Sequence, residues 1–315
     1  MRRAGGQALS LLAAPLNVHI LQTLSEGPKE LMELRRAVGS PPQSTMRVYS
    51  RTLAELGILE QQRQKEFAGS SLYKITASGT ALLKVGEVLQ EWLNASPDGP
   101  IQLGSTPAKS TVGALVEGWS TNIVRALAAK PLSLTQLNRL IPKVSYPSLE
   151  RRLGGLRLAN LVEPHPGEGR GTPYRTTEWL RRAVVPTASA VGWERKYLAD
   201  STPPVGRLDV EAAFLLAIPL MILPDTLTGK CRLAVEVQGG KSPVFAGVLV
   251  CVEEGRVVSC SSRLEGEVEG WASGTPMEWL RRMNGGGNEG LDIGGDVGLV
   301  LTLTDALRAA GTTAV

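Results

Sequence analysis

An internal repeat with an offset of about 103 residues constrains the fold of this chain more than any other feature. The segment Leu24–Pro28 resembles Leu127–Pro131, and Leu53–Glu60 resembles Leu156–Glu163 at the same offset. Two residues are lost before the next similar segment, which is what a change in hairpin length produces. Two copies of one unit of this size predict two domains that share the same order of helices and strands.

Hydrophobic spacing gives that order for the first copy. We expect helices at 8–24, 29–38, 43–56 and 78–93, a turn at 39–42, and a β-hairpin made of strands 59–66 and 72–76. In the third helix, Met46, Tyr49, Leu53 and Leu56 share one inward face. Helix, short helix, turn, longer helix and hairpin is the order of a winged helix-turn-helix.

Several segments of the first copy resemble the HxlR-type bacterial regulators, which are relatives of the MarR family. They are Ala8–Leu12, Ile20–Pro28, Leu31–Ala37 and Tyr73–Leu83. The resemblance covers most of residues 8 to 93 and recurs over 110 to 198. It implies a DNA-binding transcription regulator. The chain departs from the family pattern at 15–17, where it has Pro-Leu-Asn, and at 154–155, where two glycines interrupt the second recognition helix.

The net charge of +4 is divided unevenly along the chain. Residues 1 to 105 carry a net +2, residues 106 to 204 carry +7, and the last 111 residues carry −5. A basic front half favours a polyanion as its partner, whereas solvated faces of unrelated domains would explain the same charges. Double-stranded DNA is therefore the expected partner.

The residues expected to contact DNA lie on the outward face of each third helix and on each wing, and arginines recur in both copies. They are Gln43, Ser44, Thr45, Arg47, Val48, Arg51, Arg63 and Lys65 in the first copy and Ser145, Tyr146, Ser148, Arg151, Arg152, Arg170 and Arg175 in the second. An arginine can grip guanine O6 and N7, hydroxyls reach base edges or phosphates, and a valine can meet a thymine methyl group.

Two such modules in one chain act as a covalent pseudo-dimer on successive major grooves, about 34 Å apart. The two third helices differ in sequence, so the half-sites should differ too. Residues 94–109, rich in proline and glycine, are expected to be the linker. The competing hypothesis is a tandem winged-helix scaffold that binds protein, which the near-neutral first copy favours. Formation of a homodimer is left open.

The pattern changes after residue 204. We expect a helix at 209–223, strands at 231–238, 243–253, 256–261 and 264–271, a helix at 275–283, and a last helix that ends near 309. The segments Gly270–Leu280 and Leu291–Asp296 resemble the sterol carrier protein type-2 fold.

That resemblance implies a site for a small apolar effector. The candidate lining residues are Phe214, Ile218, Met221, Phe245, Val248, Trp271, Trp279 and Leu299. The alternative is that these side chains simply fill a core. A lipid carrier with a regulatory front half is the third hypothesis for the whole chain.

The expected fold class is α+β, with two tandem winged helix-turn-helix domains at 1–96 and 108–200 and a sterol-carrier-like domain at 205–315.

We expect no enzymatic activity, because the two histidines, His19 and His165, have no partner for catalysis nearby in sequence. No cofactor or metal site is expected. The longest apolar run has 12 residues, so we expect no membrane segment. The three cysteines form no CxxC pair, which favours a reducing cytoplasm.

Overall fold

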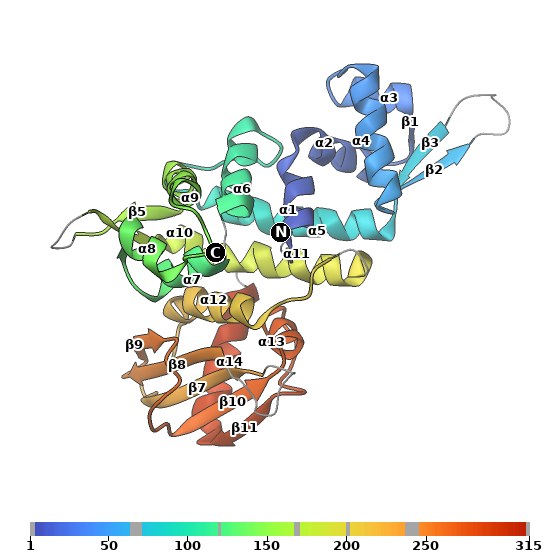
Figure 1. Cartoon of the computed structure of the whole chain (residues 1–315). Helices are drawn as coiled ribbons and strands as arrows, with labels where there is room; N and C mark the ends of the chain where they lie inside the picture. Colours follow the sequence, from blue (N-terminus) through green and yellow to red (C-terminus); the bar gives the residue numbers. More distant parts are fainter. Residues whose placement is uncertain are drawn as a thin grey trace. The chain divides into compact units, whose positions relative to one another are not determined.

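A computed structural model of the chain describes residues 4–63, 71–118, 121–166, 171–199, 202–236 and 246–312 (Figure 1). Backbone contacts divide it into two compact units. The first contains residues 1–116 and 189–203, and the second contains residues 117–188 and 204–315. These boundaries do not coincide with the predicted ones, because the second repeat and the acidic C-terminal segment share one unit.

The first unit contains the predicted helix-turn-helix and hairpin. Its elements are α1 (Gly6–Ala13), α2 (Pro15–Ser25), β1 (Lys29–Glu30), α3 (Leu31–Ala37), α4 (Gln43–Glu55), β2 (Leu59–Arg63), β3 (Ser71–Ile75), α5 (Ala77–Asn94) and most of α6 (Thr106–Gly118). The strands form an antiparallel sheet in the order β1-β3-β2. Ile20, Leu34, Met46 and Leu53 are fully buried, so α2, α3 and α4 each contribute to one core. The predicted bounds of α4 and of the second hairpin strand agree closely with this structure, and the first strand begins at Leu59 as predicted; its predicted end at 64–66 lies outside the described residues.

The expected single helix over 8–24 is wrong. Two helices, α1 and α2, meet at Ala14 and are bent by 85°. Pro15 is the first residue of α2, a position where its missing N–H is not needed, whereas a proline inside a helix disrupts it. Among the described residues no single helix has the length and apolar character to cross a membrane; only the bent pair α1 and α2 meets that criterion jointly.

The predicted linker at 94–109 packs against α5. The side chain of Gln90 accepts a hydrogen bond from the Leu103 N–H at 2.6 Å and donates one to the Ile101 carbonyl at 2.9 Å. Leu103 is buried, and α6 already begins at Thr106. This segment is therefore a folded part of the first unit.

A buried carboxylate on α11 (Val184–Tyr197) holds the start of α1. Glu194 is fully buried, and its two oxygens accept hydrogen bonds from the N–H groups of Gly5 at 2.7 Å and Ala8 at 2.8 Å. These N–H groups belong to the N-cap and the third residue of α1, where the helix itself offers no acceptor. A negative charge is favourable at this end of a helix dipole. The neighbouring Trp193 donates its indole N–H to the Ser78 carbonyl at 2.9 Å.

The second unit begins with elements in the same order as the first. They are α7 (Thr121–Ala129), β4 (Leu132–Ser133), α8 (Leu134–Leu140), α9 (Tyr146–Leu158), β5 (Val162–Pro164), β6 (Pro173–Thr176), α10 (Glu178–Arg182) and the first part of α11. The strand order, β4-β6-β5, is that of the first sheet.

Local geometry repeats as well. Gly57 and Asn160, which are equivalent in the repeat, both have a positive φ, of 67° and 55°. The hydroxyl of Thr76 donates to the carbonyls of residues 57 and 58, and that of Thr177 donates to those of residues 160 and 161. Each threonine also caps the helix that follows it. The junction between third helix and wing is therefore built in the same way twice.

The rest of the second unit is a five-stranded sheet with helices. Its elements are α12 (Arg207–Ala217), a 3₁₀ turn (Ile218–Leu220), β7 (Gly229–Val235), β8 (Ala246–Glu253), β9 (Arg256–Ser261), β10 (Gly270–Gly274), α13 (Pro276–Met283), β11 (Asp292–Gly295) and α14 (Val297–Thr312). The strand order is β11-β10-β7-β8-β9, and among these pairs β10 and β7 run parallel. Figure 1 shows α12 and α14 beside this sheet.

Two expected elements of this region are wrong in extent. The helix expected over 209–223 ends at Ala217, because Pro219 cannot continue its hydrogen bonds. The strand expected over 264–271 begins only at Gly270. The alternating glutamates of 265–269 have the period of a strand but lie before it, exposed. The three cysteines lie on β7, β8 and β9, as expected for ordinary strand residues.

Candidate nucleic-acid interface

The outward face of α4 carries two arginines and several small groups. Arg47 and Arg51 are exposed, and so are Gln43, Ser44 and Val48, while Thr45 is half-buried. Met46 and Leu53 fix this orientation because they are fully buried on the opposite face, whereas the expected inward residues Tyr49 and Leu56 are half-buried. The structure therefore brings the predicted groups of this helix other than Thr45 together on one accessible side.

The charges of the two arginines act on a buried tyrosine. Tyr73, in the middle of β3, is 6% exposed. Burial raises the pKa of Tyr73, while the positive charges of Arg47 and Arg51 lower it. Within the described part of the chain, neither arginine forms a salt bridge with a carboxylate. Their charge is therefore available to a ligand.

The first wing also carries basic residues. Arg63 is the last residue of β2, but its side chain lies outside the described residues, and exposed Lys74 lies on β3. Lys65 lies outside the described residues. Antiparallel pairing joins Gln62 to Leu72 and Arg63 to Ser71.

The equivalent face of α9 is less basic. α4 and α9 both have 13 residues and begin 103 residues apart, so their positions correspond one to one. By this correspondence Glu150 takes the place of Arg47, and Gly154 takes the place of Arg51. Glu150 and Arg151 are both exposed. The expected recurrence of arginines in both copies does not hold at matching positions.

The other predicted residues of the second copy are dispersed. Ser145 and Tyr146 are exposed at the start of α9, and Ser148 is half-buried. Arg152 is half-buried, as is Tyr49 at the matching position of α4. On the wing, Arg175 donates to Glu163 at 2.7 Å, a pair in which both side chains are about half exposed. Arg170 lies outside the described residues.

Most of the residues proposed to line an apolar site are buried. Phe214, Ile218, Val248, Trp279 and Leu299 are buried with at most 3% exposure, Met221 is buried, Trp271 is half-buried, and Phe245 lies outside the described residues. The rings of Phe214 and Trp279 meet edge to face with centroids 4.8 Å apart. The indole N–H of Trp279 donates to the Ala234 carbonyl at 2.8 Å.

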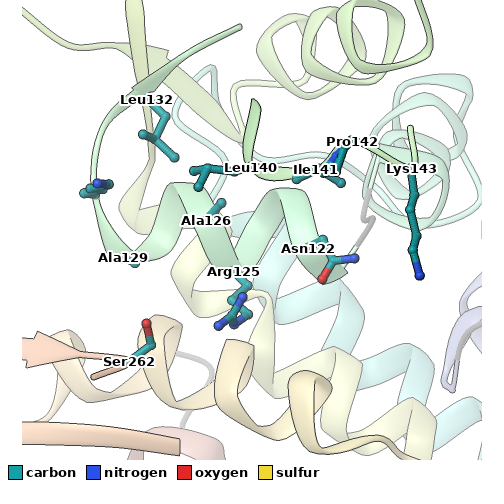
Figure 2. Close-up of a pocket in the computed structure, with 11 residues that line it drawn as sticks. Asn122, Arg125, Ala126, Ala129, Leu132, Leu140, Ile141, Pro142, Lys143 and Ser262 are labelled. Atoms are coloured by element: carbon teal, nitrogen blue, oxygen red, sulfur yellow. The ribbon is translucent and has the colours of Figure 1, made fainter. Parts of the chain in front are cut away.

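A cavity of about 480 Å³ lies elsewhere in the second unit (Figure 2). Its lining comes from α7 and the residue after it, from β4, from the end of α8 and the turn before α9, and from the residue after β9. The lining residues are Asn122, Arg125, Ala126, Ala129, Lys130, Leu132, Leu140, Ile141, Pro142, Lys143 and Ser262. In Figure 2 the side chains of Arg125 and Ser262 lie on one side of α7, and those of Leu132 and Leu140 lie on the other.

Polar contacts join α7 and α10 to α12 beside this cavity. The Nε of Arg125 donates to Glu211 at 2.5 Å, and the Glu211 side chain is only 3% exposed. Arg181 donates to the Leu215 carbonyl at 2.7 Å, near the end of α12. Burial lowers the pKa of Arg181. A cation is favourable at the negative end of a helix, so this contact stabilises the packing of α10 on α12.

Sequence reasoning missed the cavity. Its cations are Arg125 on α7, Lys130 directly after α7 and Lys143 in the turn before α9, and Ser262 follows more than a hundred residues later. No motif or spacing connects them. Among the described residues, no group of three or more histidine, cysteine or carboxylate side chains is arranged to hold a metal ion.

Comparison with known proteins supports the interpretation of the first copy. No curated protein matches the chain. Residues 12–98 match a family described as HxlR-like helix-turn-helix, and the match spans α2 to α5, including the exposed face of α4. The first copy is therefore similar to an HxlR-type domain, and this similarity supports a DNA-binding transcription regulator.

Proposed function

We propose that this protein is a cytoplasmic, non-enzymatic transcription regulator. It binds double-stranded DNA through tandem winged helix-turn-helix modules, and the segment 205–315 places that binding under the control of a small effector. The observation that carries the proposal is the exposed arginine pair on α4, which forms no salt bridge among the described residues and lies within a segment similar to the HxlR-like family. Insertion of this helix into a major groove would bring Arg47 and Arg51 to base edges or phosphates.

The repeated junction between third helix and wing supports a second winged module. Gly57 and Asn160 share the left-handed conformation, and the two three-stranded sheets share one strand order. The modules differ in charge on the recognition face, so α4 is the principal reader. We expect α9 to contribute less, with Arg151 as its main basic group.

Effector control is supported by the way the second unit is assembled. The second module and the segment 205–315 belong to one compact unit. The buried Glu211 of that segment pairs with Arg125 of the module. A ligand bound in this unit would change DNA affinity only if it binds the DNA-competent arrangement with a different affinity.

The alternative is a tandem winged-helix scaffold that binds protein. The exposed Glu150 at the position of Arg47 favours it for the second copy, because a carboxylate on a recognition helix repels phosphates. The test is binding of the purified full chain to fragments from upstream of its own gene at 50 mM and 200 mM salt. DNA binding through several phosphates weakens steeply over this range. A folded protein that binds none of these fragments at either salt concentration would favour the scaffold.

A further inference from the structure

The cavity beside α7 is positively charged. Its eleven lining residues include Arg125, Lys130 and Lys143 and no aspartate or glutamate. Arg125 is held in place by Glu211, which offsets one of the three charges. Lys130 and Lys143 are exposed, and within the described residues neither forms a salt bridge. The cavity therefore retains the positive charges of Lys130 and Lys143, which favour an anionic ligand.

The remainder of the lining is mainly apolar. Ala126, Ala129, Leu132, Leu140, Ile141 and Pro142 contribute aliphatic surface. Leu140 is 57% exposed although Ile141, next to it, is only 6% exposed. A volume of about 480 Å³ falls in the range of small-molecule sites, which are roughly 300–1,000 Å³ and combine apolar walls with a few polar groups.

The cavity also adjoins the turn that leads into α9. Ile141 caps α8, and its carbonyl accepts a hydrogen bond from the Val144 N–H at 3.1 Å. Lys143 lies three residues before Tyr146, where α9 begins. Ser262 reaches the same cavity from the end of β9. A molecule bound here would touch the turn of the second module and the C-terminal sheet together.

We infer that this cavity binds a small organic acid with an apolar body, whose anionic group is held by Lys143. The bound molecule is the effector and acts on the turn before α9. This inference rests on the proposed function for its regulatory part, while the binding site stands on the cavity alone. The cavity shares no lining residue with the Phe214–Trp279 region, where the sequence predicted the effector site. The ligand inferred here is an anion, whereas the predicted effector was purely apolar.

The test is calorimetric titration of the full chain, without DNA, with 2-naphthoate, with decanoate, and with the uncharged 2-naphthamide. The two acids distinguish a compact aromatic body from a lipid-like tail. We expect saturable binding of at least one acid and binding about tenfold weaker for Lys143→Met, because a hydrogen bond to a charged group is lost. The same substitution should leave 2-naphthamide binding unchanged. Lys84→Met, which removes an exposed lysine from α5, is the matched control.

A second variant tests the apolar wall. Leu140→Ser changes an exposed side chain, so the fold should tolerate it, and it should weaken the acid and the amide alike. Failure of both acids to bind the folded protein would overturn the inference. So would acid binding that Lys143→Met does not weaken. Loss of DNA affinity in Lys143→Met without loss of acid binding would also overturn it, and would make Lys143 a phosphate contact.

The regulatory part is measured separately, as the change in DNA affinity at a saturating concentration of the acid. We expect a change of about fivefold or more, which is the usual lower bound for coupled sites. Acid binding that depends on Lys143, in a protein that binds no DNA, would support the site and refute the proposed function. An unchanged DNA affinity with the acid bound would overturn the effector role.

Discussion

The double substitution Arg47→Ala/Arg51→Ala removes the two cations that define the α4 face. Both side chains are exposed and make no described salt bridge, so their loss leaves no carboxylate unpaired among the described residues. Met46 and Leu53, which hold the helix in the core, are untouched. Surface substitutions of this kind usually change stability by less than about 0.5 kcal/mol. The variant should therefore fold like the parent chain.

The expected effect follows from helix geometry. Four residues of an α-helix rise about 6 Å, so two side chains that point the same way span about two base steps of DNA. Each arginine that grips a base contributes about 1–3 kcal/mol, and the pair about 2–6 kcal/mol. DNA binding should weaken at least about thirtyfold. If the arginines contact phosphates instead, the slope of log affinity against log salt should fall by about 0.9 for each.

Fluorescence anisotropy with labelled upstream DNA at several salt concentrations measures both quantities. The matched control is Lys230→Ala/Arg256→Ala, which removes the same charge from exposed positions on β7 and β9. The control should bind like the parent chain if the effect is local. Equal losses in the two double variants would mean that only net charge matters. An unchanged affinity and salt slope for Arg47→Ala/Arg51→Ala would refute α4 as the DNA reader.

Three further predictions concern buried groups. Glu194→Gln removes the negative charge that accepts two hydrogen bonds at the start of α1. The free energy of unfolding, measured in urea, should fall by about 1–3 kcal/mol. An unchanged value would show that the charge is not needed there. Burial raises the pKa of Cys231 to about 12, so its contribution to stability is complete below about pH 9 and lost as the pH rises toward 12. In the native protein at pH 8, a thiol reagent should leave Cys231 unmodified, and rapid labelling would contradict its burial. Arg125→Met should destabilise the second unit by about 3 kcal/mol, because it leaves the buried Glu211 unpaired. The double variant Arg125→Met/Glu211→Met should recover much of that loss. A double variant less stable than Arg125→Met would show that the pair itself stabilises the protein.

The elements of the first copy could be predicted because local signals agree with tertiary packing. The bounds of α4 follow from its apolar spacing and from the glycine and prolines of the preceding turn. The break at Pro15 was also present in the sequence, but an apolar stripe that continues across it gave the appearance of one helix. Around β10 a local pattern was misleading. The alternating glutamates of 265–269 predicted a strand, but the strand begins at Gly270 and consists mostly of small, buried residues that pair in parallel with β7.

The candidate sites divide in the same way. The α4 face was predictable because helical period alone decides which residues oppose Met46 and Leu53. The cavity was not, since Arg125, Lys143 and Ser262 come together only through tertiary packing. The number of arginines in each copy was also a poor guide to the second DNA-contacting face. The alignment of α9 with α4 decides which residues occupy matching positions, and Arg47 and Arg51 are replaced by Glu150 and Gly154.

That register leads to a last prediction, on Glu150. The scaffold of the two copies is alike, but an exposed glutamate replaces Arg47, so α9 as it stands opposes contact with phosphates. Glu150→Arg restores the cation at this position. If α9 lies along the duplex, the substitution should tighten DNA binding about tenfold and steepen the salt slope by about one, measured by the same anisotropy titrations. Glu178→Arg, an equal change of charge at an exposed position on α10, is the control. An unchanged affinity for Glu150→Arg would place α9 away from the DNA and leave recognition to α4 alone.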